Sequence, residues 1–161
     1  GSIMAYVVTY SENMCSGFMQ SLCPSAKLEL KCLLTGCRLV LRSLYMGAEF
    51  SLEQGSERDS APAVVWHIDS KDEKTLVEYY PEGLFERINF RLILEKIQME
   101  AFLFVVRGQE TALPDDEYIE MTAEAYEEHG FDFWHVEQAL DEAADNLKGG
   151  NRDGIIHAGT D

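Results

Sequence analysis

Ala5-Tyr-Val-Val-Thr-Tyr-Ser-Glu-Asn-Met14 is the stretch that decides the fold of this chain. Residues 4–10 are rich in β-branched and aromatic side chains, which suit a buried strand. Ser11, Glu12 and Asn13 are residues typical of turns and helix starts. A strand that ends in a helix-opening loop presents free backbone N–H groups, which can receive a carboxylate or an oxyanion. Most such strands end in a turn that binds nothing. The interpretation of this stretch as a binding site therefore depends on agreement from other parts of the chain.

The length and composition predict one globular domain. The chain has 161 residues, enough to bury a substantial core, and no apolar run long enough to cross a membrane. Gly1-Ser2-Ile3 is interpreted as an expression scar, and we expect no signal peptide. We therefore expect a cytoplasmic protein without a membrane partner.

The charge is strongly acidic. A formal net charge of −16 argues against direct binding to nucleic acid, which requires a basic surface. The common explanation is a solvated acidic surface that aids solubility. A DNA mimic, or an inhibitor of a basic partner, is the less common one and requires the acidic residues to cluster on one exposed face.

The cysteines predict neither a metal site nor a disulfide framework. They crowd the first quarter of the chain without a CxxC pair or a suitably spaced histidine, at Cys15, Cys23, Cys32 and Cys37. We interpret them as reduced, mostly buried thiols, and we expect no metal and no cofactor.

Periodicity and breakers outline the elements of a domain over residues 4–147, followed by a flexible tail over 148–161. Helices are predicted over 11–22, 69–80, 114–129 and 133–147, and strands over 4–10, 62–68, 88–95 and 101–106. Residues 28–44 fit a helix as well as two strands around Gly36, and we prefer the strands because glycine is unfavourable within a helix. Residues 49–61 are polar and indicate a loop beside the site or a turn between short strands. Trp66 and Trp134 are expected in the core, whereas His67 is expected to be a satisfied strand histidine.

Four separated segments share motifs with a known family, in the same order and at similar spacing. They are Tyr10-Ser-Glu-Asn-Met14; Cys23-Pro-Ser-Ala26 with Leu34-Thr-Gly-Cys-Arg-Leu39; Val65-Trp-His-Ile68 with Asp72-Glu-Lys-Thr-Leu76; and Pro114 to Tyr118 with Gly130-Phe-Asp132. In these segments the chain resembles the γ-glutamyl cyclotransferase-like superfamily, especially its small bacterial members. The resemblance implies an α+β fold with a small mixed β-barrel and peripheral helices, and it favours the two strands around Gly36.

The resemblance also implies a reaction. In such enzymes the α-amine of the substrate attacks its own γ-glutamyl carbonyl, which releases 5-oxoproline and an amine. One buried carboxylate with a raised pKa can accept the ammonium proton and then protonate the leaving nitrogen. The substrate-binding positions that the resemblance implies are Tyr10, Ser11, Glu12, Asn13, Met14, Phe85 and Tyr118.

This chain departs from the family pattern at the implied site. The loop glycine and serine of the family correspond to Ser11 and Glu12, and its tyrosine before the next strand corresponds to Phe85. Glu12 adds a negative charge where the family receives a carboxylate. The catalytic glutamate of the family corresponds to Tyr80, which is a poor base at neutral pH because an unperturbed tyrosine has a pKa near 10.

Three interpretations remain open, so whether the chain is an enzyme is unsettled by its sequence. Glu78 or Glu82 could replace the missing base if Pro81 and Gly83 shift the loop; for either alone, a solvated surface carboxylate is the commoner case. Tyr80 could act as an acid or hydrogen-bond donor, or be a packed aromatic. Alternatively, the chain has lost catalysis and kept a pocket for a small amine-bearing molecule or a protein partner. We expect a monomer or a homodimer that binds a small γ-glutamyl or amine-bearing molecule.

Overall fold

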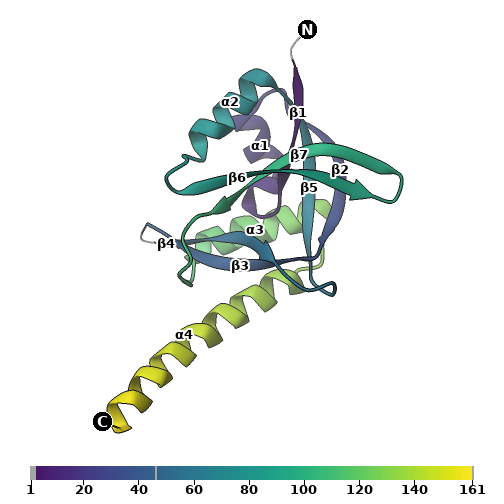
Figure 1. Cartoon of the computed structure of the whole chain (residues 1–161). Helices are drawn as coiled ribbons and strands as arrows, with labels where there is room; N and C mark the ends of the chain where they lie inside the picture. The colour runs from purple at the N-terminus through teal and green to yellow at the C-terminus, as the bar shows by residue number, and fades with distance from the viewer. Residues whose placement is uncertain (1–2, 46, 161) are drawn as a thin grey trace.

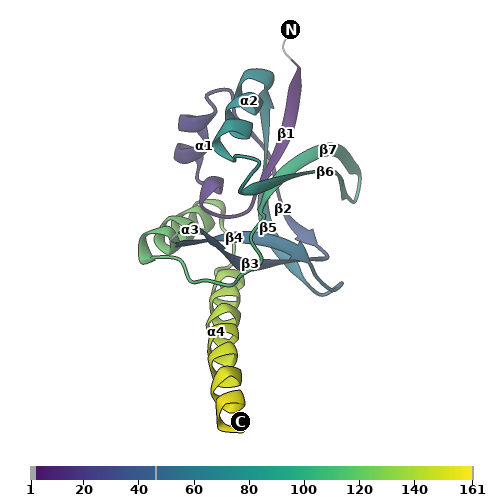
Figure 2. The same ribbon diagram turned by 60° about the vertical axis from the view of Figure 1, so that its left-hand side comes forward.

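The computed structural model describes residues 3–45 and 47–160, except for the side chains of residues 150–160. Over these residues the strands form a five-stranded mixed sheet and a two-stranded antiparallel sheet, with helices packed around them (Figures 1 and 2). The predicted α+β fold with peripheral helices is confirmed. The strands of the described ranges divide into two separately hydrogen-bonded sheets and do not close into one continuous barrel.

The first strand is the centre of the larger sheet. The sheet order is β2 (Lys27–Thr35), β5 (Ser60–Asp69), β1 (Met4–Thr9), β7 (Ile97–Val106) and β6 (Phe85–Leu94). β1 is antiparallel to β5 and parallel to β7, where Val7 lies opposite Phe102. Val7 and Val8 are buried, as expected for apolar residues of a central strand. The end of β1 therefore lies in the middle of the domain.

The smaller sheet is the hairpin of β3 (Cys37–Leu44) and β4 (Gly47–Gln54). Gly36 separates β2 from β3 and has a φ of 77°, a conformation that glycine adopts without a steric penalty. The preference for two strands in this region is confirmed. Of the two alternatives for residues 49–61, a continuous loop is wrong and a turn between strands is observed. β4 continues to Gln54, with Glu49 between the buried Ala48 and Phe50, and β5 begins at Ser60.

The helices are η1 (Glu12–Met14), α1 (Ser16–Leu22), α2 (Ser70–Tyr79), α3 (Asp116–His129) and α4 (Trp134–Thr160). The helix expected over 11–22 is divided at Cys15, where the backbone is extended. In both views α1 and α2 lie on one side of β1, α3 lies near the end of that strand, and α4 starts against β3 and runs away from the sheets. The chain thus surrounds the end of β1 with η1, α3 and α2.

A hydrogen-bond network explains two of the sequence motifs. The backbone N–H of Ser25 donates to Asp72 Oδ2 at 2.7 Å, and the Ser25 hydroxyl donates to the same oxygen. Asp69 caps α2 by accepting from the backbone N–H of Asp72 at 2.9 Å. The Cys-Pro-Ser-Ala and Asp-Glu-x-x-Leu segments therefore hold the loop after α1 against the start of α2, which is a structural task.

The two tryptophans differ in their exposure. Trp66 is in the core as predicted, but Trp134 is 48% exposed and stacks on His135, so its expected core position is wrong. Val136, in the same first turn of α4, is the residue that is buried in the core. The four cysteines are free thiols. The helix expected over 133–147 continues to Thr160 as α4. The domain boundary at 147 and the flexibility of residues 148–161 stay predictions. Within the described ranges, none of the helices has the length and apolar character needed to cross a membrane.

Candidate functional site

A small internal cavity of about 20 Å³ lies where β1 ends. It is lined from β1, the following loop, α1, β4, α2, β6 and β7, by Val7, Val8, Thr9, Tyr10, Ser11, Glu12, Asn13, Met19, Glu49, Phe50, Leu76, Tyr80, Phe85 and Phe104. Six of these residues are positions that the sequence resemblance had implied. A cavity of this volume has room for about one water molecule.

The loop after β1 does not use a glycine-like conformation. Ser11 has a φ of −142°, which any residue adopts, so a serine at this position carries no penalty of the kind that a left-handed backbone would impose. The loop closes with hydrogen bonds from Met14 N to Ser11 O and from Cys15 N to Glu12 O. Met14 is fully buried, and its carbonyl oxygen lies 2.5 Å from His129 Nε2. The structure therefore gives Met14 a packing role.

Glu12 is a buried carboxylate held by two hydroxyl donors. Ser11 Oγ donates to Glu12 Oε2 at 2.7 Å, and the hydroxyl of Tyr118 also hydrogen bonds to Glu12. The Tyr118 hydroxyl accepts a hydrogen bond from Phe50 N at 3.0 Å, and the two rings stack. Burial, followed by the charge of Glu12, raises the pKa of Tyr118 well above its usual value. Tyr118 thus remains a neutral donor that positions Glu12.

Glu49 is the second carboxylate at the cavity, and sequence reasoning did not identify it. It is partly buried on β4 and lies close enough to Glu12 for the two charges to interact. Burial, and then the charge of Glu12, raises the pKa of Glu49 to about 7. Glu49 can therefore both accept and release a proton near neutral pH. The available sequence signal was a glutamate between apolar residues on a strand, Ala48 and Phe50.

Tyr80, which stands at the position of the expected base, is packed into the cavity wall. Its hydroxyl accepts a hydrogen bond from Asn13 Nδ2 at 2.8 Å, and its ring stacks on Phe104 and meets Phe85 edge-on. Burial, followed by the charge of Glu12, raises the pKa of Tyr80 well above its usual value. Tyr80 is consequently unsuited to act as a base, whereas it can donate a hydrogen bond.

Asn13 presents an unused acceptor. Its Oδ1 atom is buried and has no hydrogen-bond partner within the described part of the chain. A buried polar atom without a partner is uncommon in folded proteins. An N–H donor on a ligand in this cavity would satisfy it.

The remaining predicted residues have different positions. Tyr10 lines the cavity, but its hydroxyl donates to the carbonyl oxygen of Phe104 at 2.6 Å and so links β1 to β7. Phe85 is a packed wall residue. Glu78 and Glu82 are exposed, and neither lines the cavity. The structure therefore does not bring these two carboxylates together with the loop, and a catalytic role for either stays a prediction.

The site as a whole is acidic. Within the described residues, the ion pairs of the chain do not include Glu12 or Glu49. The same part of the chain also holds no group of three or more His, Cys, Asp or Glu side chains arranged to bind a metal ion. The arrangement can accept hydrogen bonds, attract a cation and exchange a proton at Glu49.

Comparison with solved structures identifies the fold. A structure described as γ-glutamyl cyclotransferase superimposes with a TM-score of 0.75 at 16% identity, over 85% of this chain and 86% of that one. An uncharacterised human protein superimposes with a TM-score of 0.73 at 16% identity, over 84% of this chain and 86% of its own. A yeast γ-glutamyl cyclotransferase specific to glutathione does so with a TM-score of 0.54 at 9% identity, over 91% and 97%.

Sequence comparison gives no closer relationship. No protein-family model matches the chain, and no curated protein matches it significantly. At these identities the structural likeness shows the fold alone: the chain has the γ-glutamyl cyclotransferase-like fold. The resemblance identified from the sequence is supported at that level, and activity has to be argued from the site.

Proposed function

We propose that the protein acts on a small γ-glutamyl compound, or a closely related amine-bearing molecule, with Glu49 as the general acid and base. The observation that carries the proposal is a partly buried carboxylate with a pKa of about 7 in the cavity at the end of β1. A general base is most effective when its pKa lies near the working pH. The γ-glutamyl cyclotransferase-like fold supports the choice of substrate class.

The reaction needs few groups. Ionised Glu49 removes a proton from the ammonium group of the substrate, and the free amine attacks the γ-carbonyl carbon. A C–N bond forms, and the carbonyl oxygen becomes an oxyanion. Glu49 then returns the proton to the departing nitrogen as the original amide bond breaks and the carbonyl re-forms. The ring nitrogen gives its remaining extra proton to the released amine, so the products are 5-oxoproline and an ammonium ion. One carboxylate performs both transfers because it is alternately ionised and protonated.

Glu12 and Asn13 have supporting roles in this proposal. Held by Ser11 and Tyr118, the Glu12 carboxylate attracts an ammonium group, and the unpartnered Asn13 Oδ1 can accept one of its N–H bonds. Because these contacts would hold the amine beside Glu49, they would lower the entropic cost of orienting the amine for attack on the γ-carbonyl carbon.

A specific observation supports a second candidate, a binding protein without catalysis. The cavity of about 20 Å³ cannot contain a γ-glutamyl group unless side chains such as Glu49 or Tyr80 move. Tyr80 also occupies the position of the catalytic glutamate of the family. In this alternative the pocket binds a small amine and returns it unchanged. An acidic protein-interaction role remains a prediction from the charge of the chain.

The test is release of 5-oxoproline from a panel of γ-glutamyl amino acids and γ-glutamyl amides by the purified chain. The variant Glu49→Gln keeps the shape of the side chain and removes the titrating group. Glu78→Gln and Glu82→Gln are matched controls, since both are exposed carboxylates away from the cavity.

The proposal predicts release by the parent chain, a loss of about a hundredfold or more in Glu49→Gln, and little change in the two controls. If 5-oxoproline release is lost only in Glu78→Gln or only in Glu82→Gln, the substituted glutamate is the general acid and base, and it acts from the end of α2 or from the loop that follows it. No release by any variant, together with a ligand-dependent rise in melting temperature, would favour the binding protein.

A further inference from the structure

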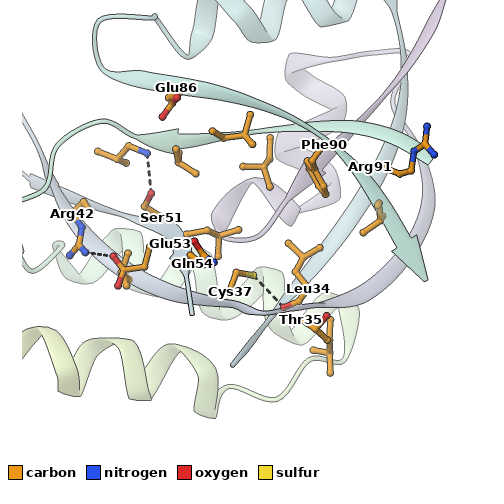
Figure 3. A pocket seen from close by; sticks show the side chains of 18 of the residues that line it. Leu34, Thr35, Cys37, Arg42, Ser51, Glu53, Gln54, Glu86, Phe90 and Arg91 are labelled. Carbon is orange, nitrogen blue, oxygen red and sulfur yellow. Dashed lines mark hydrogen bonds and ion pairs between the residues drawn. The ribbon is translucent and has the colours of Figure 1, made fainter. Parts of the chain in front are cut away.

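A second and much larger cavity lies farther along β4, between the β3–β4 hairpin and the β6–β7 hairpin. Its volume is about 890 Å³ (Figure 3). The last residues of β2 close one end, so that the walls of the cavity come from both sheets. It shares none of its described lining residues with the cavity at the end of β1.

Strand register turns a continuous apolar face toward this cavity. Ile88 pairs with Leu103 and Phe90 pairs with Ala101, so these side chains project from the same face of the β6–β7 hairpin. Phe90 and Leu34 point into the space from opposite walls in Figure 3. Leu34 and Leu103 are buried, whereas Ile88 and Phe90 retain partial exposure. The partly exposed apolar area belongs to a recess, not to a flat surface.

The arginines that line the cavity already have partners. Arg42 pairs with Glu53 at 2.6 Å, and Arg91 pairs with Glu100 at 2.9 Å. Arg107 Nε donates to the carbonyl oxygen of Glu82 at 2.5 Å. The lining residues include three arginines and an equal number of glutamates, Glu53, Glu86 and Glu95, so their formal charges balance. The rim therefore offers neither an excess of positive charge for an anionic head group nor a strong excess of negative charge for a cation.

The interior has no reactive group either. The thiol of Cys37 hydrogen bonds to the carbonyl oxygen of Leu34 at 3.3 Å, and burial raises its pKa to about 11. Ser51 accepts a hydrogen bond from Val106 N at 3.0 Å and also bonds to Tyr10. These contacts tie β4 to β7 and β1 and maintain the wall between the two cavities.

We propose that this cavity is a binding site for a small, uncharged, largely apolar molecule. Ligand pockets of proteins commonly have volumes of about 300 to 1,000 Å³ and are lined mostly by apolar side chains. The balanced charge of the rim selects against an acid or an amine, and the volume of about 890 Å³ suits a compact ring system or a short chain. The site is independent of the proposed chemistry at Glu49.

The test uses two fluorescent probes that differ in one group. N-phenyl-1-naphthylamine is uncharged, and 8-anilinonaphthalene-1-sulfonate has the same ring framework with a sulfonate. Titration of the full chain with the first probe is expected to give saturable, blue-shifted fluorescence at one site per chain. The sulfonate should bind at least about tenfold more weakly, because the chain is acidic and burial of an unpaired charge is costly.

Two substitutions locate the site. Phe90→Glu places a carboxylate in the recess and should weaken binding of the uncharged probe by about tenfold or more, whereas Val77→Glu changes an exposed apolar residue on α2 and should leave it within about twofold. Ile88→Trp narrows the recess without adding charge, which keeps the test informative if Phe90→Glu does not fold. Circular dichroism checks each variant.

Equal binding by all folded variants would overturn the proposal, as would equal or tighter binding of the sulfonate. Absence of saturable binding would do the same. A homodimer that Phe90→Glu dissociates, measured by light scattering, would also overturn it and assign the recess to a second copy of the chain.

Discussion

The side-chain amide of Asn13 donates a hydrogen bond to the hydroxyl of Tyr80 across 2.8 Å, which joins the loop after β1 to the end of α2. This bond stands where the resemblance implies a catalytic glutamate. Because Tyr80 is buried and its pKa is raised, it holds the loop but does not supply a base. The carboxylate that can exchange a proton is Glu49, on a different strand.

The Tyr80→Phe variant should destabilise the fold modestly. It keeps the stacked ring but leaves Asn13 Nδ2 without its acceptor, so the free energy of unfolding should fall by about 1 to 2 kcal/mol. Urea denaturation measures the change. Tyr79→Phe is the control, because Tyr79 is 49% exposed and should change stability by less than about 0.5 kcal/mol. An equal loss in both variants would contradict a role for the Asn13–Tyr80 bond.

Stability should depend on pH through Glu49. Folding raises the pKa of Glu49 from 4.5 to about 7, so the folded chain binds the proton more tightly than the unfolded chain. The contribution of Glu49 to the free energy of unfolding is therefore fully present below pH 4.5 and is lost as pH rises through about 7.

The Glu49→Gln variant should remove this dependence. After allowance for solvent screening of a partly exposed side chain, we expect it to be more stable than the parent chain by about 1 to 2 kcal/mol at pH 8. The two chains should converge below pH 4.5, where the carboxyl group is protonated in both the folded and the unfolded chain. Thermal and urea denaturation across this range measure the difference, with Glu78→Gln as the control. A constant difference at all pH values would show that Glu49 does not titrate there.

The Gly36→Ala variant tests the turn between β2 and β3. The φ of Gly36 is 77°, and an added Cβ would meet no atom within 4 Å, so only backbone strain should contribute. We expect a loss of about 1 to 2 kcal/mol in the free energy of unfolding. Gly83→Ala is the matched control, since a Cβ there also meets open space and the φ of Gly83 is not positive. Similar results for both glycines would rule out a special requirement at position 36.

The Asp72→Ala variant tests the network between the loop after α1 and α2. It removes the acceptor for both the N–H and the hydroxyl of Ser25, and Asp72 itself is buried. The expected loss is about 2 to 3 kcal/mol, because hydrogen bonds to a charged group are the stronger ones. Glu73→Ala, which breaks an ion pair with Arg87, should cost no more than about 1 kcal/mol. A larger loss of stability in Glu73→Ala than in Asp72→Ala, measured by urea denaturation, would contradict a stabilising role for this network.

The fold was predictable where local signals agreed with one another. The β-branched run of β1, the glycine between β2 and β3, and the alternation in the β6–β7 hairpin all predicted the observed strands. Spacing from the motifs also led to Tyr80, which the structure places in the cavity wall.

The site was only partly predictable because its acidic pair comes from distant segments. Glu12 was visible as a departure within a motif, but Glu49 reaches the same cavity only because the β3–β4 hairpin packs near the end of β1. From the sequence, Glu78 and Glu82 were candidates to replace the missing base, yet both side chains are exposed. Strand partners and solvent exposure are non-local properties, and periodicity does not specify them.

The central claim is that the carboxyl group of Glu49 titrates near neutral pH and responds to an amine in the cavity. Nuclear magnetic resonance of the full chain with ¹³C-labelled glutamate measures this directly, with Glu49→Gln to assign the signal. We predict a carboxyl resonance with a pKa of about 7 that is absent from the variant, and a lower pKa when a γ-glutamyl amide or a simple amine binds, because a nearby cation favours the ionised form. An ordinary pKa for Glu49, or a pKa that no ligand of the panel changes, would contradict the account.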